Sequence, residues 1–117
     1  MVAGQAEVSA VLAAERAAIC QRLEQLEREF TGIVEAVGPA GADDEHDPEG
    51  ATIAFERQHV AALASQARDH LAQIEAAMRR LAQGGYGICE DCAQPIPAAR
   101  LAARPAATTC LSCATRR

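Results

Sequence analysis

The stretch CEDCAQPIPAARLAARPAATTCLSC, residues 89–113, contains two Cys-x-x-Cys pairs with 17 residues between them. This spacing is typical of a tetrahedral structural zinc site, because each pair places two sulfur atoms near one ion and the loop returns the second pair to it. The sequence therefore predicts one structural zinc ion, and its four ligands are Cys89, Cys92, Cys110 and Cys113.

Other chemistries of paired cysteines fit this segment less well. An iron–sulfur cluster can use four thiolates, but the sequence shows no second cluster or electron partner. A thioredoxin-like pair opens a helix within a βαβ unit, and no strands are evident. A zinc deaminase needs an H-x-E element and an open metal position, whereas H-x-E is absent and four cysteines fill the shell. We therefore expect no enzymatic activity.

Length and composition limit the kind of fold. The chain has 117 residues, and its interior-filling aromatic residues are two Phe and one Tyr, without Trp. One domain with a thin core is expected. The start of the chain lacks the basic region of a signal peptide, and no stretch approaches the ~20 apolar residues of a membrane span. These features favour a cytoplasmic protein, in which paired cysteines bind metal rather than form disulfides.

Two helices are predicted before the cysteine segment. The first is expected to end at Gly38-Pro39, and a second to run from about Pro48 to Gln83, followed by Gly84-Gly85. In the first helix, the apolar residues from Ile19 onward recur at alternating steps of four and three residues, which is a heptad pattern. The predicted apolar positions of the two helices are Val8, Leu12, Ile19, Leu23, Leu26, Phe30, Ile33 and Val37, and Ile53, Val60, Leu63, Ala67, Leu71, Ile74, Met78 and Leu81.

Neither helix buries its apolar stripe alone, so the two stripes are expected to face each other. The predicted fold is all-α: a long antiparallel helical hairpin, a coiled coil, over residues 1–83, and a small C-terminal four-cysteine zinc finger over 84–117. The tip loop at about 38–50 holds five acids and no base. Its candidate functional acids are Asp43, Asp44, Asp47 and Glu49.

Several charged and reactive side chains also have purely structural explanations. An acidic turn is often only a solvated loop that also stabilises the following helix. Cys20 is interpreted as a small, partly buried apolar side chain. Four thiolates on Zn²⁺ carry a charge of −2, which cancels the local positive charge of the finger. Sequence-specific DNA binding through its arginines is therefore not expected.

The run GGYGICEDCAQPIPAARLAARPAATTCLSC, residues 84–113, resembles the C4 zinc-finger signature of the DksA/TraR proteins. It has their aromatic-Gly-x-Cys entry, the Ile-x-x-x-Arg-Leu segment at Ile96, Arg100 and Leu101, and Ala-Arg-Pro before the second pair. The resemblance implies a bacterial, monomeric transcription regulator that binds RNA polymerase. Its hairpin would enter the secondary channel, where the acidic tip modulates initiation complexes.

The sequence departs from the family pattern at two places. The family's tip motif is Asp-x-x-Asp-x-Ala, but the positions in register hold His46, Glu49 and Ala51, while Asp44 and Asp47 form a shifted pair. The family binds guanosine tetraphosphate through basic residues near the finger. Arg104 matches one of them, and Arg100 lies close by in sequence. Gln73 stands where lysine is usual, which speaks against a response to that nucleotide.

Two other functions remain open on the sequence alone. A coiled-coil adaptor held together by zinc, for example as a homodimer, would bind partners other than polymerase. DNA binding by the finger would show steep salt dependence, and we rank it last.

Overall fold

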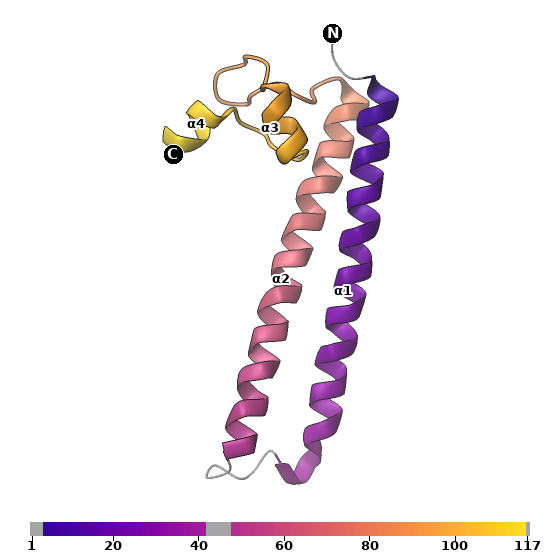
Figure 1. Ribbon diagram of the computed structural model, residues 1–117, viewed down its shortest axis with the longest axis vertical. Helices are drawn as coiled ribbons and strands as arrows, with labels where there is room; N and C mark the ends of the chain where they lie inside the picture. Colours follow the sequence, from indigo (N-terminus) through magenta and orange to yellow (C-terminus); the bar gives the residue numbers. More distant parts are fainter. Residues whose placement is uncertain (1–3, 42–47, 117) are drawn as a thin grey trace. The chain divides into compact units, whose positions relative to one another are not determined.

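The computed structural model describes the backbone of residues 4–41 and 48–116, and the side chains of 4–35 and 50–116. Its helices are α1 (Gln5–Gly41), α2 (Pro48–Gln83), α3 (Ala98–Ala103) and α4 (Leu111–Arg116), shown in Figure 1. In this part of the chain the β-structure is limited to one isolated antiparallel bridge between Ile88 and Pro95. The all-α prediction is confirmed, although the short helices α3 and α4 were not predicted.

The chain divides into two compact units. The first combines Met1–Ala17 with Leu71–Arg117, so that the cysteine segment groups with the first turns of α1 and the last turns of α2. The second unit is Ala18–His70. The sequence predicted a boundary between the hairpin and the finger after residue 83. The two compact units are divided elsewhere, because the finger has few apolar side chains of its own and packs with helix residues.

In the first unit, the beginning of α1 lies beside the end of α2, as Figure 1 shows. The Gln5 side-chain amide donates to the carbonyl oxygen of Leu81 at 3.2 Å. Further along the two helices, the Arg16 guanidinium donates to the Glu75 carboxylate from Nε at 3.2 Å and from Nη2 at 3.0 Å. These contacts fix an antiparallel register around the fully buried side chains of Leu12 and Ile74.

In the second unit, the two helices again pack along their predicted apolar positions. The interior there consists of short and medium side chains: Ile19, Leu26, Val60, Ala64 and Ala67. Ala64 was not among the predicted positions. It continues the heptad steps of four and three from Val60 through Ala67 to Leu71, so the drift that the sequence indicated at Leu63 is absent from the structure. An exposed ion pair between Arg68 and Glu27, at 3.6 Å, lies outside this interior.

The two long helices end differently. α2 ends at Gln83 as predicted, in a Schellman motif in which the Gly85 amide donates to the Arg80 carbonyl at 2.8 Å. Gly84 takes the positive φ, 87°, that this motif requires. The predicted stop of the first helix at Gly38-Pro39 is wrong, because α1 continues to Gly41. Proline has a helical φ, so its ring removes one hydrogen bond near the helix end without preventing helical backbone.

Candidate metal centre

The first cysteine pair lies on a tight turn that follows the end of α2. Gly87, with φ 83°, lets the chain reverse, and its carbonyl oxygen accepts a hydrogen bond from the Ile96 amide at 2.7 Å. Within the turn, the Cys89 amide donates to Gln94 at 2.9 Å, and the Ala93 amide donates to Cys89 at 2.9 Å. These bonds hold Cys89 and Cys92 on one short loop.

The second pair lies at the start of α4. Cys110 precedes the first helical residue, and its carbonyl oxygen accepts a hydrogen bond from Ala114 at 3.0 Å. Cys113 lies one turn later and is buried. The two pairs are joined by the Glu90 amide, which donates to the carbonyl oxygen of Thr108 at 2.8 Å. Backbone hydrogen bonds thus fix both pairs relative to each other.

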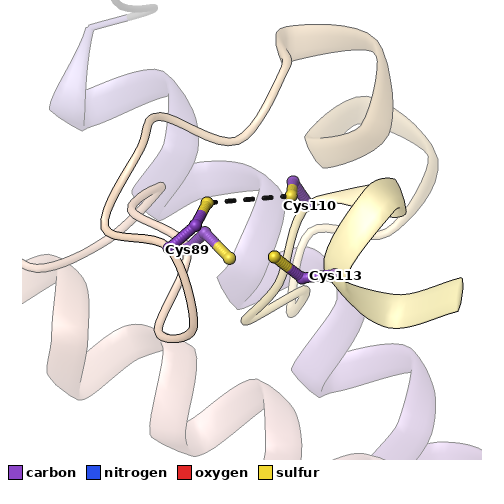
Figure 2. A group of neighbouring side chains, drawn as sticks. Cys89, Cys110 and Cys113 are labelled. Carbon is purple, nitrogen blue, oxygen red and sulfur yellow. Dashed lines mark hydrogen bonds between the residues drawn. The ribbon is translucent and has the colours of Figure 1, made fainter. Parts of the chain in front are cut away.

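The four predicted ligand residues come together in one cluster. The sulfur atoms of Cys89, Cys92, Cys110 and Cys113 all lie within 4.8 Å of one another. Figure 2 shows the side chains of Cys89, Cys110 and Cys113 converging. The sulfur atoms of Cys92 and Cys110 lie 3.9 Å apart. Among the described residues, this is the one cluster of three or more candidate metal ligands.

The sulfur separations fit zinc and exclude a disulfide. A Zn–S bond of about 2.3 Å gives a tetrahedron with edges of about 3.8 Å, close to the contact in this cluster. A disulfide bond is about 2.05 Å long, and all five cysteines of the chain are free thiols. The residues present therefore fit one zinc ion, bound by the four thiolates, which would hold the two turns together.

The surroundings of the thiols favour deprotonation at one cysteine but not at another. Burial alone would raise the pKa of Cys89, but hydrogen bonds from backbone amides, chiefly those of Cys110 and Cys92, lower the pKa to about 6. Hydrogen bonding to the Cys110 thiol, followed by burial, raises the pKa of Cys113 to about 12. Four thiolates at one place require a cation to offset their mutual repulsion, which a divalent metal supplies.

The cluster sits in a small apolar environment. Ile96, Cys89 and Cys113 are buried together, with Leu101 and Cys110 packed against them. This is little apolar surface for a segment of this length, so metal binding would supply much of its folding free energy.

Three arginines lie near the cluster in different environments. Arg100, on α3, donates from Nε to the Thr109 carbonyl at 2.7 Å and is half-buried. Arg116 donates from Nη2 to the Cys113 sulfur atom at 3.5 Å. Arg104 follows α3 and is exposed. The sequence grouped Arg100 with Arg104, and no local pattern indicated that Arg100 would bond within the finger.

The remaining predicted positions lie either on the two long helices or outside the described residues. Asp43, Asp44 and Asp47 lie outside the described residues, and so does the side chain of Glu49, in the first turn of α2. Gln73 is exposed on α2, and Cys20 is half-buried on α1, which agrees with its interpretation as a partly buried side chain. Within residues 4–41 and 48–116, no helix has both the length and the apolar character needed to cross a membrane.

Together, the fold and the cluster define a helical-hairpin protein with a four-cysteine zinc finger. Comparison with known proteins shows what each part of the chain is similar to. Residues 84–117 match the model of the prokaryotic dksA/traR C4-type zinc finger. Over 96% of this chain and 81% of the other, the fold matches the structure of transcription factor DksA2 from Pseudomonas aeruginosa, with a TM-score of 0.80 and 27% identity.

Curated relatives match over shorter segments. The uncharacterized protein YteA of Bacillus subtilis (strain 168) is 42% identical over 72 residues, 62% of this chain and 30% of YteA. The RNA polymerase-binding transcription factor DksA of Caulobacter vibrioides (strain NA1000 / CB15N) is 49% identical over 41 residues, 35% of this chain and 29% of that protein. The chain thus spans less than a third of these relatives' length. Its C-terminal segment matches the DksA/TraR family of C4-type zinc fingers, and the fold of nearly the whole chain is similar to that of DksA2.

Proposed function

We propose that this protein is a non-enzymatic, cytoplasmic transcription regulator that binds RNA polymerase. The observation that carries this proposal is the match to DksA2, a transcription factor, over 96% of the chain. The relative in Caulobacter vibrioides binds RNA polymerase, according to its name, and is 49% identical to this chain over 41 residues. Similarity that includes both the hairpin and the finger favours a shared partner over a shared metal site alone.

The mechanism proposed for the hairpin is insertion into the secondary channel of polymerase. The acids Asp43, Asp44, Asp47 and Glu49 would act there, because concentrated negative charge attracts a bound divalent metal ion or a basic channel wall. Their effect would be on the stability of initiation complexes. The finger would be the base from which the hairpin projects, with zinc in a structural role.

Arg104 is the arginine near the finger best suited to contact polymerase. Its side chain is exposed, whereas the Arg100 side chain is half-buried and hydrogen-bonded within the finger. We propose no dependence on guanosine tetraphosphate, because neutral Gln73 replaces the usual lysine.

A binding experiment with purified core RNA polymerase tests the proposal. The zinc-loaded protein should be retained by immobilised polymerase, and a compound or protein that occupies the secondary channel should prevent retention. Retention that is unaffected by the blocker would contradict channel insertion, and no retention would contradict the polymerase partner.

Sedimentation separates this function from that of a coiled-coil adaptor. A monomer at working concentrations agrees with channel insertion, because a hairpin that enters a channel must be free of a second copy. An obligate dimer that buries the tip would favour the adaptor instead.

A further inference from the structure

Arg100 has no role in the proposed contact with polymerase, although it is hydrogen-bonded within the finger. It lies on α3, halfway between the two cysteine pairs in sequence, and α3 supplies no metal ligand. Its Nε lies 2.7 Å from the carbonyl oxygen of Thr109. This bond is shorter than the contacts that Arg80 and Arg116 make with carbonyl oxygens, both of which are 3.4 Å.

The acceptor of this bond adjoins a metal ligand. The carbonyl of Thr109 belongs to the peptide group that joins Thr109 to Cys110. A hydrogen bond to that oxygen restrains the plane of the peptide that precedes Cys110. The Ala114 amide restrains the following peptide by donating to the Cys110 carbonyl at 3.0 Å, and the two restraints together orient the Cα–Cβ bond of Cys110. Thr109 is also buried, at 6% exposure, so water cannot readily replace a missing donor.

A second bond restrains the same segment from the other side. The Glu90 amide, next to Cys89, donates to the carbonyl of Thr108 at 2.8 Å. The segment that leads into Cys110 is therefore held at two successive carbonyls, one by the first cysteine turn and one by Arg100. Removing Arg100 leaves only the first restraint.

We propose that Arg100 is a positioning residue for zinc, which orients Cys110 through the Thr109 carbonyl. The property required is a donor at the Nε position, and the positive charge is secondary. Outer-shell groups of this kind commonly change metal affinity by about 10–100-fold when they are removed. Loss of Arg100 should therefore loosen zinc binding without altering the hairpin.

Three substitutions separate the donor from the charge. Glutamine carries an amide nitrogen at the same number of bonds from the backbone as Nε, so Arg100→Gln keeps the donor and removes the charge. Arg100→Lys keeps the charge but places a methylene group where Nε was, and Arg100→Met removes both. Arg104→Met, at an exposed arginine nearby, is the matched control.

The test measures zinc affinity of the full-length protein by competition with a coloured chelator. We expect Arg100→Met and Arg100→Lys to bind zinc about 10-fold more weakly or worse, with Arg100→Gln and Arg104→Met near the parent value. In Co²⁺-loaded protein, the thiolate-to-metal and ligand-field bands should shift for Met and Lys but not for Gln. Far-ultraviolet circular dichroism checks that the helices of each variant remain.

Two results would overturn the proposal. Parent-like zinc affinity and Co²⁺ bands in Arg100→Met would show that the bond does not position Cys110. Equal weakening in Arg100→Gln and Arg100→Met would show that charge, and not the donor, is what the metal site requires. Arg100→Gln is a mild change at a half-buried position. Where Arg100→Met perturbs folding, the zinc affinities of Arg100→Gln and Arg100→Lys still separate the donor from the charge.

Discussion

The Tyr86 hydroxyl donates to the carbonyl oxygen of Pro105 at 2.8 Å. Tyr86 precedes the first cysteine pair and Pro105 the second, so this bond ties together the two segments that lead to the metal cluster. Burial raises the pKa of Tyr86, and the nearby Arg80 opposes the increase. The phenol therefore stabilises the finger only in its protonated form.

This relationship predicts a loss of stability at high pH. A folded-state pKa above the ordinary value of 10.0 means that the folded protein holds the phenol proton more tightly than the unfolded chain does. The contribution is complete below pH 10 and disappears as the pH rises through the folded-state pKa. Tyr86 is the chain's one tyrosine, so the absorbance band of tyrosinate reports its titration directly.

The control for this prediction is Tyr86→Phe. It should lower the free energy of unfolding by about 1 kcal/mol near neutral pH, through loss of the hydrogen bond, and should flatten the alkaline part of the pH profile. Thermal unfolding of the zinc-loaded proteins over a range of pH measures both effects. An alkaline profile that is unchanged in Tyr86→Phe would assign the titration to another group.

The backbone at Ala93 predicts a stabilising substitution. Ala93 has a φ of 62°, a left-handed conformation that costs an L-residue other than glycine roughly 1–2 kcal/mol. Glycine relieves this strain but loses more entropy on folding, so Ala93→Gly should stabilise the finger by up to about 1 kcal/mol. Ala99→Gly, in α3, is the control and should destabilise it. Chemical denaturation of zinc-loaded protein measures the difference, and a destabilised Ala93→Gly would contradict the argument.

Metal removal should affect the two parts of the chain unequally. Without zinc, the buried group of Cys89, Ile96 and Cys113 lacks the energy to stay ordered, whereas the buried contacts of α1 and α2 do not depend on the metal. Cys113→Ser should abolish stoichiometric zinc binding, and Cys20→Ser should leave it intact. Zinc analysis together with amide resonances of the finger measures this outcome. A finger that stays ordered in chelator would show that its small core suffices.

Packing at the base of the hairpin predicts a large difference between two neighbouring residues. Leu12 is fully buried and Val11 is 50% exposed. Leu12→Ala should cost about 2–5 kcal/mol of stability because it leaves a cavity, and Val11→Ala should cost far less. The midpoint of denaturant unfolding measures both. Similar costs at the two positions would mean that Leu12 does not belong to the interior.

The sequence predicted repeating features of the fold more accurately than single contacts. Heptad positions such as Leu26 and Ile74 are buried, because a periodic pattern determines which face of a helix packs. The cysteine spacing identified the metal cluster because four ligands of one type are a specific signal. The bonds of Arg100 and Tyr86 were not predicted, since each joins residues from different turns of an irregular segment. The predicted end of the first helix at Gly38-Pro39 was wrong because proline was taken as a helix stop, whereas α1 continues to Gly41.

The acidic tip predicts a separation of binding from function. In the proposed mechanism, Asp44→Asn, Asp47→Asn and Glu49→Gln together remove three negative charges without removing the hairpin or the finger, so retention by core polymerase should persist. Effects on the lifetime of promoter complexes should disappear, because three of the five acids of the tip loop would no longer carry charge to the catalytic centre. A control with Glu24→Gln, Glu29→Gln and Asp69→Asn removes the same charge from exposed helix positions and should keep regulation. The measurement is the lifetime of promoter complexes with the parent protein and with both variants. Regulation that survives loss of the tip acids would exclude these acids as the acting groups. Regulation that is lost equally in the control would make net charge the cause.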